Sequence, residues 1–187
     1  MIGFDQILKV LPLVPKIRQY LRRPQLRVYF DAAQTYHIRA VVDAGGVAGY
    51  FCHLMVANDG REVAHGCQGR LLEVHQRNDD GSSVPAVNFV APVILKWAHE
   101  PDWGVRDIDP RPLPPRRLDL GYAVESQPNV LRFFAPPMPL GVQTTFPPGV
   151  YLARVRVDSA NARSAEGWFR VDFTHGWNQI VVAPSQG

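Results

Sequence analysis

The stretch Gly49–His75, GYFCHLMVANDGREVAHGCQGRLLEVH, carries the strongest fold signal in the chain. Two largely apolar runs flank Asp59–Gly60. An Asp-Gly pair between such runs is typical of a β-hairpin with a two-residue turn, because glycine readily adopts the positive φ that the turn needs. The register that follows pairs Asn58 with Arg61, Val56 with Val63, Leu54 with His65 and Cys52 with Cys67. Since side chains alternate between the faces of a strand, we expect Cys52, His65 and Cys67 to share one face.

Most of the remaining chain alternates apolar and polar residues with the period of two that is typical of β-strands. Besides the hairpin, we expect strands over Leu26–Phe30, Tyr36–Val42, Val87–Trp97, Arg117–Glu125, Val130–Phe134, Tyr151–Asp158, Trp168–Phe173 and Ile180–Ala183. The 17 prolines and 15 glycines supply frequent turns between them. Nine or ten short strands, with no helical period after Arg23, predict an all-β antiparallel sandwich.

The segment Pro148–Val155, PGVYLARV, resembles the Gly-x-Tyr-x-Cys entry to the penultimate strand of immunoglobulin-like domains. The resemblance covers Gly149 and Tyr151, and it implies that the Tyr151 hydroxyl group donates a hydrogen bond to backbone a few residues upstream. Ala153 stands where antibody domains have their second cysteine, so the inter-sheet disulfide is absent. Trp97 is the candidate for the buried core tryptophan. The resemblance therefore implies an immunoglobulin-like β-sandwich, a fold that serves many unrelated functions.

The N-terminal segment Met1–Arg23 differs from the rest of the chain in charge and in pattern. It carries five cationic residues and one aspartate, a net charge of +4, whereas the whole chain has +3, so the remainder sums to −1. A basic surface over the body, as nucleic-acid binding needs, is therefore not expected. On a helical wheel the segment is amphipathic, and Pro12 and Pro15 should kink the helix. We therefore expect a helical segment over residues 1–24 and a sandwich domain over residues 25–187.

The apolar side of that segment is too wide to remain in contact with water. One interpretation is that it packs on its own sandwich and covers an open edge or face. The other is that it docks into a partner protein, into a second copy of the chain, or into the interface of an anionic membrane. The contacts expected in that case are Ile7, Leu11, Val14, Ile17 and Leu21, with Arg22 and Arg23 as a charged rim.

The residues expected on the hairpin face, Cys52, His65 and Cys67, are candidate zinc ligands, and the two cysteines are also a candidate redox pair or disulfide. Their spacing matches no standard zinc module, and a fourth ligand is not evident. Buried thiols commonly pack as small apolar groups, so we favour core packing and expect neither a metal nor another cofactor.

Four tryptophans, Trp97, Trp103, Trp168 and Trp177, raise a carbohydrate-binding alternative, in which a row of exposed rings stacks on sugars. Trp168 alternates away from the core positions, and Trp177 lies in a loop, so both are also candidate anchors of a protein interface. The motif Pro112–Arg117, PLPPRR, fits a polyproline II ligand of the PxxPxR type. We favour a stiff loop there, because proline-rich connectors often match such motifs by chance.

No catalytic motif is evident in the sequence. The acidic pairs Asp79–Asp80 and Asp107–Asp109 lie in expected loops, and no glycine-rich loop opens a helix. Without a visible signal peptide or a bilayer-spanning apolar run, we expect a cytoplasmic protein, or one at the periphery of a membrane. We therefore expect a non-enzymatic interaction or assembly module attached through its N-terminal helix. The alternatives are a peripheral membrane module and a sandwich that binds carbohydrate or metal.

Overall fold

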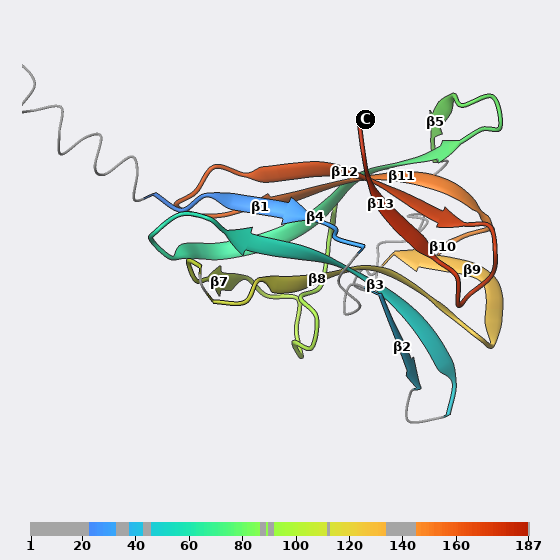
Figure 1. Cartoon of the computed structure of the whole chain (residues 1–187), viewed down its shortest axis with the longest axis horizontal. Coiled ribbons are helices and arrows are strands. Elements are labelled where there is room, and N and C mark those ends of the chain that lie inside the picture. The colour runs from blue at the N-terminus through green and yellow to red at the C-terminus, as the bar shows by residue number, and fades with distance from the viewer. Residues whose placement is uncertain are drawn as a thin grey trace, which may run out of the picture.

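A computed structural model describes residues 23–32, 38–42, 46–86, 89, 92–111, 113–133 and 145–186. They form an all-β structure of two antiparallel sheets, consistent with a sandwich (Figure 1). The helix expected over residues 1–24 lies almost wholly outside the described residues. Within these ranges, no helix has the length and apolar composition needed to cross a membrane.

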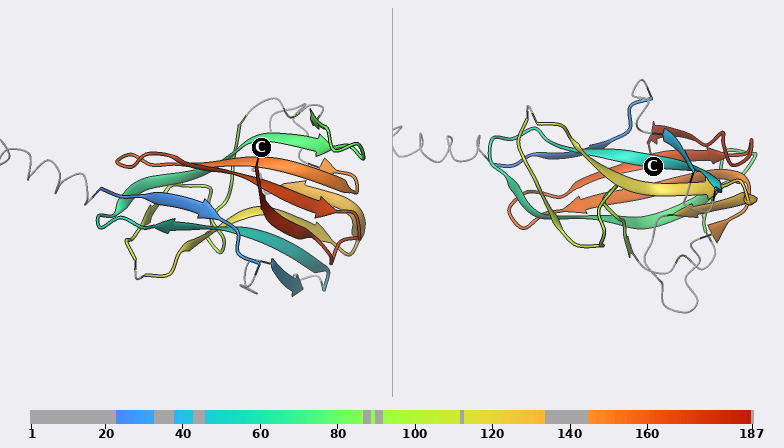
Figure 2. Two further views of the ribbon diagram at one scale, coloured as in Figure 1. Left: turned by 45° about the horizontal axis from the view of Figure 1, so that its top comes forward. Right: turned by 90° about the horizontal axis from the view of Figure 1, so that it is seen from below.

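The first sheet has six strands in the order β1-β3-β8-β9-β10, and β2 also pairs with β3. Its strands are β1 (Leu26–Tyr29), β2 (Ile38–Val42), β3 (Ala48–Asn58), β8 (Arg116–Val124), β9 (Gln127–Phe133) and β10 (Thr145–Phe146). The second sheet has seven strands in the order β13-β12-β11-β4-β5, and β6 and β7 also pair with β4. Its strands are β4 (Ala64–Arg77), β5 (Ser83–Pro85), β6 (Val93–Ile94), β7 (Arg106–Ile108), β11 (Gly149–Asp158), β12 (Ala165–Phe173) and β13 (Val181–Ser185). Further views show the two layers facing each other (Figure 2).

The long alternating stretches form strands where the sequence predicts them, most clearly in β8, β11 and β12. Four of the thirteen strands, β5, β6, β7 and β10, have only two or three residues. Strands this short carry no readable period, and they exist because their backbone pairs with a longer neighbour. Among the described residues of the strand expected over Val87–Trp97, Val93–Ile94 forms a strand that pairs with β4, directly after Pro92.

The predicted hairpin at Asp59–Gly60 is wrong. The strands on either side of it belong to different sheets, since β3 pairs with β1, β2 and β8, whereas β4 pairs with β11 and with β5, β6 and β7. The chain therefore crosses from one layer to the other at this point. The pairing of Cys52 with Cys67 is wrong for the same reason, and these cysteines and His65 do not share one hairpin face.

The local geometry explains why Asp59–Gly60 does not close a hairpin. Neither residue has the positive φ that a type I′ turn requires. Glycine is needed here for a different reason, because a Cβ atom at position 60 would lie 2.3 Å from the carbonyl oxygen of Arg23. Gly60 thus allows the chain before β1 to pass directly against the crossing.

The core lies between the sheets and draws apolar side chains from both. Tyr151 is fully buried, and its hydroxyl group donates a hydrogen bond of 2.6 Å to the carbonyl oxygen of Pro147. This bond runs to backbone four residues upstream, as the tyrosine corner requires. Trp97 is also buried in the core, where it forms an isolated bridge with Leu118 of β8.

Candidate functional site

Three chain segments meet at one end of the sandwich, which we call the N-terminal junction: residues 23–26, 58–63 and 159–164. The start of β1, the crossing from β3 to β4 and the turn from β11 to β12 lie together at the left of Figure 1. Gln25 and Arg163 form an isolated parallel bridge that joins the first and third segments.

The side chain of Asn58 holds this junction together. It is only 1 % exposed, and its Oδ1 atom accepts hydrogen bonds from the backbone N–H groups of Gln25 and Gly60, both at 3.0 Å. Its Nδ2 atom donates to the carbonyl oxygens of Glu62 at 2.7 Å and Ile108 at 3.1 Å. Both ends of the amide are therefore satisfied, as a buried polar group requires.

The turn from β11 to β12 is fixed against the same crossing by a second asparagine. Asn161 Oδ1 accepts from the backbone N–H of His65 at 2.8 Å, and its Nδ2 donates to the carbonyl oxygen of Val63 at 2.9 Å. The backbone N–H of Ala160 donates to the carbonyl oxygen of His65 at 2.9 Å. The three segments of the junction thus form one hydrogen-bonded unit.

A cavity of about 700 Å³ lies among these segments. Its lining residues are Arg23, Pro24, Gln25, Leu26, Ala160, Asn161, Ala162, Arg163 and Ser164, and they include two arginines but no carboxylate. Arg23 and Arg163 are both exposed, and neither forms an ion pair with the described residues. The junction cavity is therefore cationic.

Three acidic residues of the junction or beside it are paired with other arginines, Glu166 among them with Arg154, whereas Glu62 is exposed and forms no ion pair with the described residues. Asp59 is paired with the Nε atoms of Arg27 and Arg111, each at 2.9 Å. Asp158 is paired with the Nε atoms of Arg70 at 3.2 Å and Arg156 at 3.0 Å. These two acids therefore do little to neutralise the arginines of the cavity.

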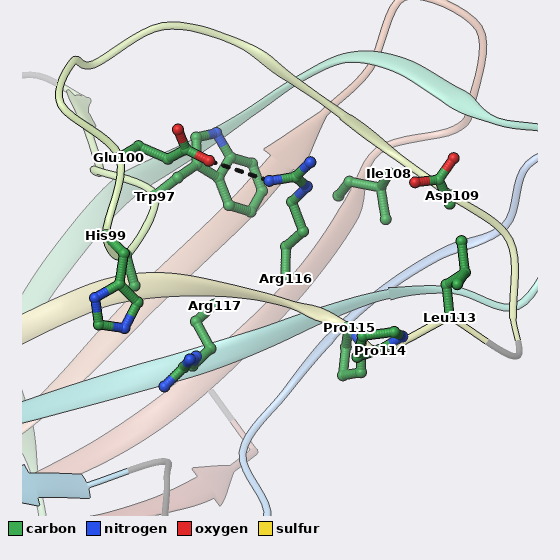
Figure 3. Close-up of a pocket in the computed structure, with 11 residues that line it drawn as sticks. Trp97, His99, Glu100, Ile108, Asp109, Leu113, Pro114, Pro115, Arg116 and Arg117 are labelled. Carbon is green, nitrogen blue, oxygen red and sulfur yellow. Dashed lines mark hydrogen bonds and ion pairs between the residues drawn. The ribbon is translucent and has the colours of Figure 1, made fainter.

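A second cavity, of about 380 Å³, lies beneath the connection that leads into β8. In Figure 3 the side chains of Glu100 and Arg116 point toward each other beside Trp97. The Glu100 carboxylate accepts from Arg116 at 3.1 Å and from Arg106 at 3.1 Å. These contacts fix the connection to the start of β8. Arg116 and Arg117 are already part of β8, so the end of the PxxPxR match lies in a strand of the first sheet.

The structure separates the three candidate metal ligands. Cys52 lies in β3 of the first sheet, and Cys67 lies in β4 of the second, each buried as a free thiol. Burial raises the pKa of Cys52 to about 12 and that of Cys67 to about 11, so both stay protonated at neutral pH. His65 is exposed. No three histidine, cysteine, aspartate or glutamate side chains of the described ranges are grouped to hold a metal ion.

His65 instead pairs with Asp107, whose Oδ2 atom lies 2.9 Å from the His65 Nδ1 atom. A hydrogen bond from the backbone N–H of Gly66, followed by the bond to His65, lowers the pKa of the Asp107 carboxyl group. Ser159 is close by, but its hydroxyl group donates to the carbonyl oxygen of His65 and not to the ring. The serine, histidine and aspartate therefore do not form a nucleophile relay.

The tryptophans do not form one row. Trp97 is buried in the core, whereas Trp168 lies half-buried on the outer face of β12. There the ring meets the His75 ring edge-on, with centroids 5.3 Å apart, and the Arg154 guanidinium 5.9 Å from its centroid. Trp177 is half-buried and packs against the core. The outward position expected for Trp168 is therefore confirmed.

Of the expected attachment residues, only Arg23 is described, and Ile7, Leu11, Val14, Ile17, Leu21 and Arg22 lie outside the described residues. The sequence did not predict a role for Asn58 or Arg163. No local pattern marks either residue, because their roles depend on segments that are distant in the sequence. Comparison of the chain with protein-family models, with curated proteins and with solved structures yields no match.

Proposed function

We propose that the chain is a non-enzymatic attachment module, in which residues 1–23 connect a β-sandwich to a partner protein or to a second copy of the chain. The observation that carries this proposal is the rigid start of the sandwich. Pro24 is buried, Gln25 donates its N–H to Asn58, and its carbonyl oxygen accepts from the N–H of Asp59 at 2.8 Å. The chain is thus fixed to the sandwich from Pro24 onward, directly after the segment that we propose for attachment.

We also assign the sandwich to the immunoglobulin-like architecture. The tyrosine corner at Tyr151 and the adjacent order β4-β11-β12, which matches strands C, F and G, support this assignment. The order of the other sheet departs from it. In that sheet β8 lies beside β3, at the place of strand E, and β9 lies at the outer place of strand D. Along the chain β8 comes before β9, whereas strand D comes before strand E in an immunoglobulin domain.

The chemistry of the described side chains supports a binding role over a catalytic one. The cysteine thiols are held protonated by burial, and the Ser159 hydroxyl group is bonded to a backbone oxygen. The apolar side chains of residues 1–23 supply the binding energy in this proposal. Burying one such side chain contributes on the order of 2 kcal/mol, so five can support an association after ordering costs.

Size-exclusion chromatography with light scattering on the full chain tests the attachment role. We expect the wild type to form concentration-dependent oligomers, and Leu11→Asp and Leu21→Asp to shift it to the monomer mass. On a helical wheel Gln19 falls on the polar side with Asp5, Lys9 and Lys16, so Gln19→Asp introduces the same charge there and should leave the mass unchanged. Identical, equally soluble monomers for all four proteins, with no binding to vesicles, would contradict the attachment role.

A second candidate function, a peripheral membrane module, is favoured by Arg23 and Arg163, which lie close to the start of the sandwich and form no ion pair with the described residues. Co-sedimentation with phosphatidylserine vesicles distinguishes the two candidates. Binding that weakens as salt rises, with the protein monomeric in solution, supports the membrane.

A further inference from the structure

We propose that the junction cavity binds the phosphate group of a phosphate monoester, with Arg23 and Arg163 as its two cationic partners. This site shares Arg23 with the charged rim expected for attachment, but it does not use the apolar side chains of residues 1–22, so a substitution on that apolar side separates the two proposals. Its first support is the lining itself, which places two arginines and no acidic residue around about 700 Å³. That volume lies within the range of small-molecule sites.

Two acidic residues next to the cavity are already paired with other arginines. Asp59 and Asp158 are each held by two other arginines, and neither Arg23 nor Arg163 has an ion-pair partner within the described part of the chain. Two other cavities differ in this respect, since Glu100 and Asp109 line the one beside Trp97 and Asp79 lines one at the end of β4. Of these three cavities, the junction cavity has the lining that favours an anion most.

The arrangement suits a phosphate group better than a carboxylate. A single arginine can satisfy both oxygens of a carboxylate through a bidentate contact, whereas a phosphate group presents three oxygens and up to two charges. Two arginines from separate segments match that larger charge. The side-chain amide of Gln25, which forms no hydrogen bond with other described residues, adds a neutral donor.

The same lining indicates an ester in preference to free phosphate. Pro24, Leu26, Ala160 and Ala162 contribute apolar surface next to the arginines. That surface can contact the carbon atoms attached to the phosphate group. A soluble metabolite and a phospholipid headgroup share this chemistry, so the experiment separates them.

The backbone gives the cavity a fixed shape. Asn58 and Asn161 hold the first and third segments against the crossing between the sheets, and the Gln25–Arg163 bridge joins those segments directly. The two arginines therefore extend from backbone that is already in place, which lowers the ordering cost of binding.

The test is calorimetric titration of the full chain with glycerol 3-phosphate. We expect saturable binding that Arg23→Gln and Arg163→Gln each weaken by about tenfold, as expected for loss of one hydrogen bond to a charged group. Arg77→Gln is the matched control, because Arg77 is exposed, lacks an ion-pair partner among the described residues and lines a cavity at the other end of β4. It should leave the affinity unchanged. Since Arg23 and Arg163 hold no ion pair within the described ranges, their substitution should also leave the melting temperature unchanged.

Vesicles of phosphatidylcholine, with and without phosphatidic acid, identify the source of the phosphate group. Co-sedimentation that needs phosphatidic acid and is lost in Arg163→Gln assigns a lipid headgroup. Saturable binding of glycerol 3-phosphate without co-sedimentation assigns a soluble ester, and either result supports the site. The site would be overturned by the absence of both saturable glycerol 3-phosphate binding and phosphatidic-acid-dependent co-sedimentation, or by equal weakening in all three substitutions. Leu11→Asp should impair attachment and leave glycerol 3-phosphate binding intact, so the two proposals fail separately.

Discussion

His53 of β3 and Asp119 of β8 stand opposite each other in the first sheet, with His53 Nδ1 2.7 Å from Asp119 Oδ1. The two residues are 5 % and 7 % exposed. They lie outside the core cluster, which takes the alternate residues Cys52 and Leu54 of β3. The sheet register thus places a histidine ring and a carboxylate in direct contact at a buried position.

Removing one member of this pair should destabilise the fold. Asp119→Ala leaves a buried histidine without its carboxylate, and we expect a loss of about 3 kcal/mol in the free energy of unfolding, measured by urea denaturation. The double variant His53→Leu/Asp119→Leu should lose less, because no buried polar side chain then remains without its partner. Arg170→Ala, which breaks the exposed pair with Asp172, is the control and should have a far smaller effect. An Asp119→Ala midpoint equal to that of the wild type would refute the structural role of the pair.

Gly60 should not tolerate a larger residue, because a Cβ atom has no room there. Its backbone φ is not the reason. A Cβ atom there would overlap the Arg23 carbonyl oxygen, so we expect Gly60→Ala to cost about 3 kcal/mol, as overpacking does. Gly46→Ala is the comparison, since Gly46 has a φ of +80° but a Cβ atom at that position would meet nothing within 4 Å. It should cost about 1 kcal/mol, from the left-handed backbone alone. If Gly46→Ala lowered the melting temperature more than Gly60→Ala, the residues before β1 would not be packed tightly against Gly60.

Tyr151→Phe removes one hydroxyl group from the core and leaves the ring in place. Because the Pro147 carbonyl oxygen then loses a bond of 2.6 Å, we expect a loss of about 1 kcal/mol in unfolding free energy. Tyr50→Phe is a suitable control, since the half-buried Tyr50 hydroxyl group has no hydrogen bond to the part of the chain that the structure describes. Equal losses in the two variants would argue against the corner as a stabilising contact.

The two cysteines should react only after unfolding. Their raised pKa values keep them as thiols, so Ellman's reagent at pH 8 should label them slowly in the native protein and rapidly in urea. These pKa shifts also make the free energy of unfolding depend on pH. In the unfolded chain the thiols ionise near pH 9, whereas in the folded protein they remain protonated to about pH 11 or 12. The unfolded state therefore binds fewer protons above pH 9, and stability should fall there; Cys52→Ser/Cys67→Ser should flatten that fall.

Much of the secondary structure followed from local pattern. The alternation along Tyr151–Asp158 and Trp168–Phe173 is strong enough to identify β11 and β12, and to show that Trp168 faces away from the core. This works because one face of each strand is buried and the other is not. The hydrogen bond from the Tyr151 hydroxyl group to upstream backbone was expected from the resemblance of Pro148–Val155 to immunoglobulin-like domains, and the structure contains it.

The partners of each strand were decided by tertiary structure alone. The Asp59–Gly60 signal says that the chain turns, but whether β3 then pairs with β4 depends on which edges β8 and β11 occupy. For the same reason His53–Asp119 and Arg23–Arg163 had no sequence signature, since each pair joins residues far apart in the chain. The periodicity of a strand indicates which of its sides is buried. Which strands pair along their edges is set by the energy of the whole sandwich. The candidate site lies where such long-range pairings meet, so only the tertiary structure decided it.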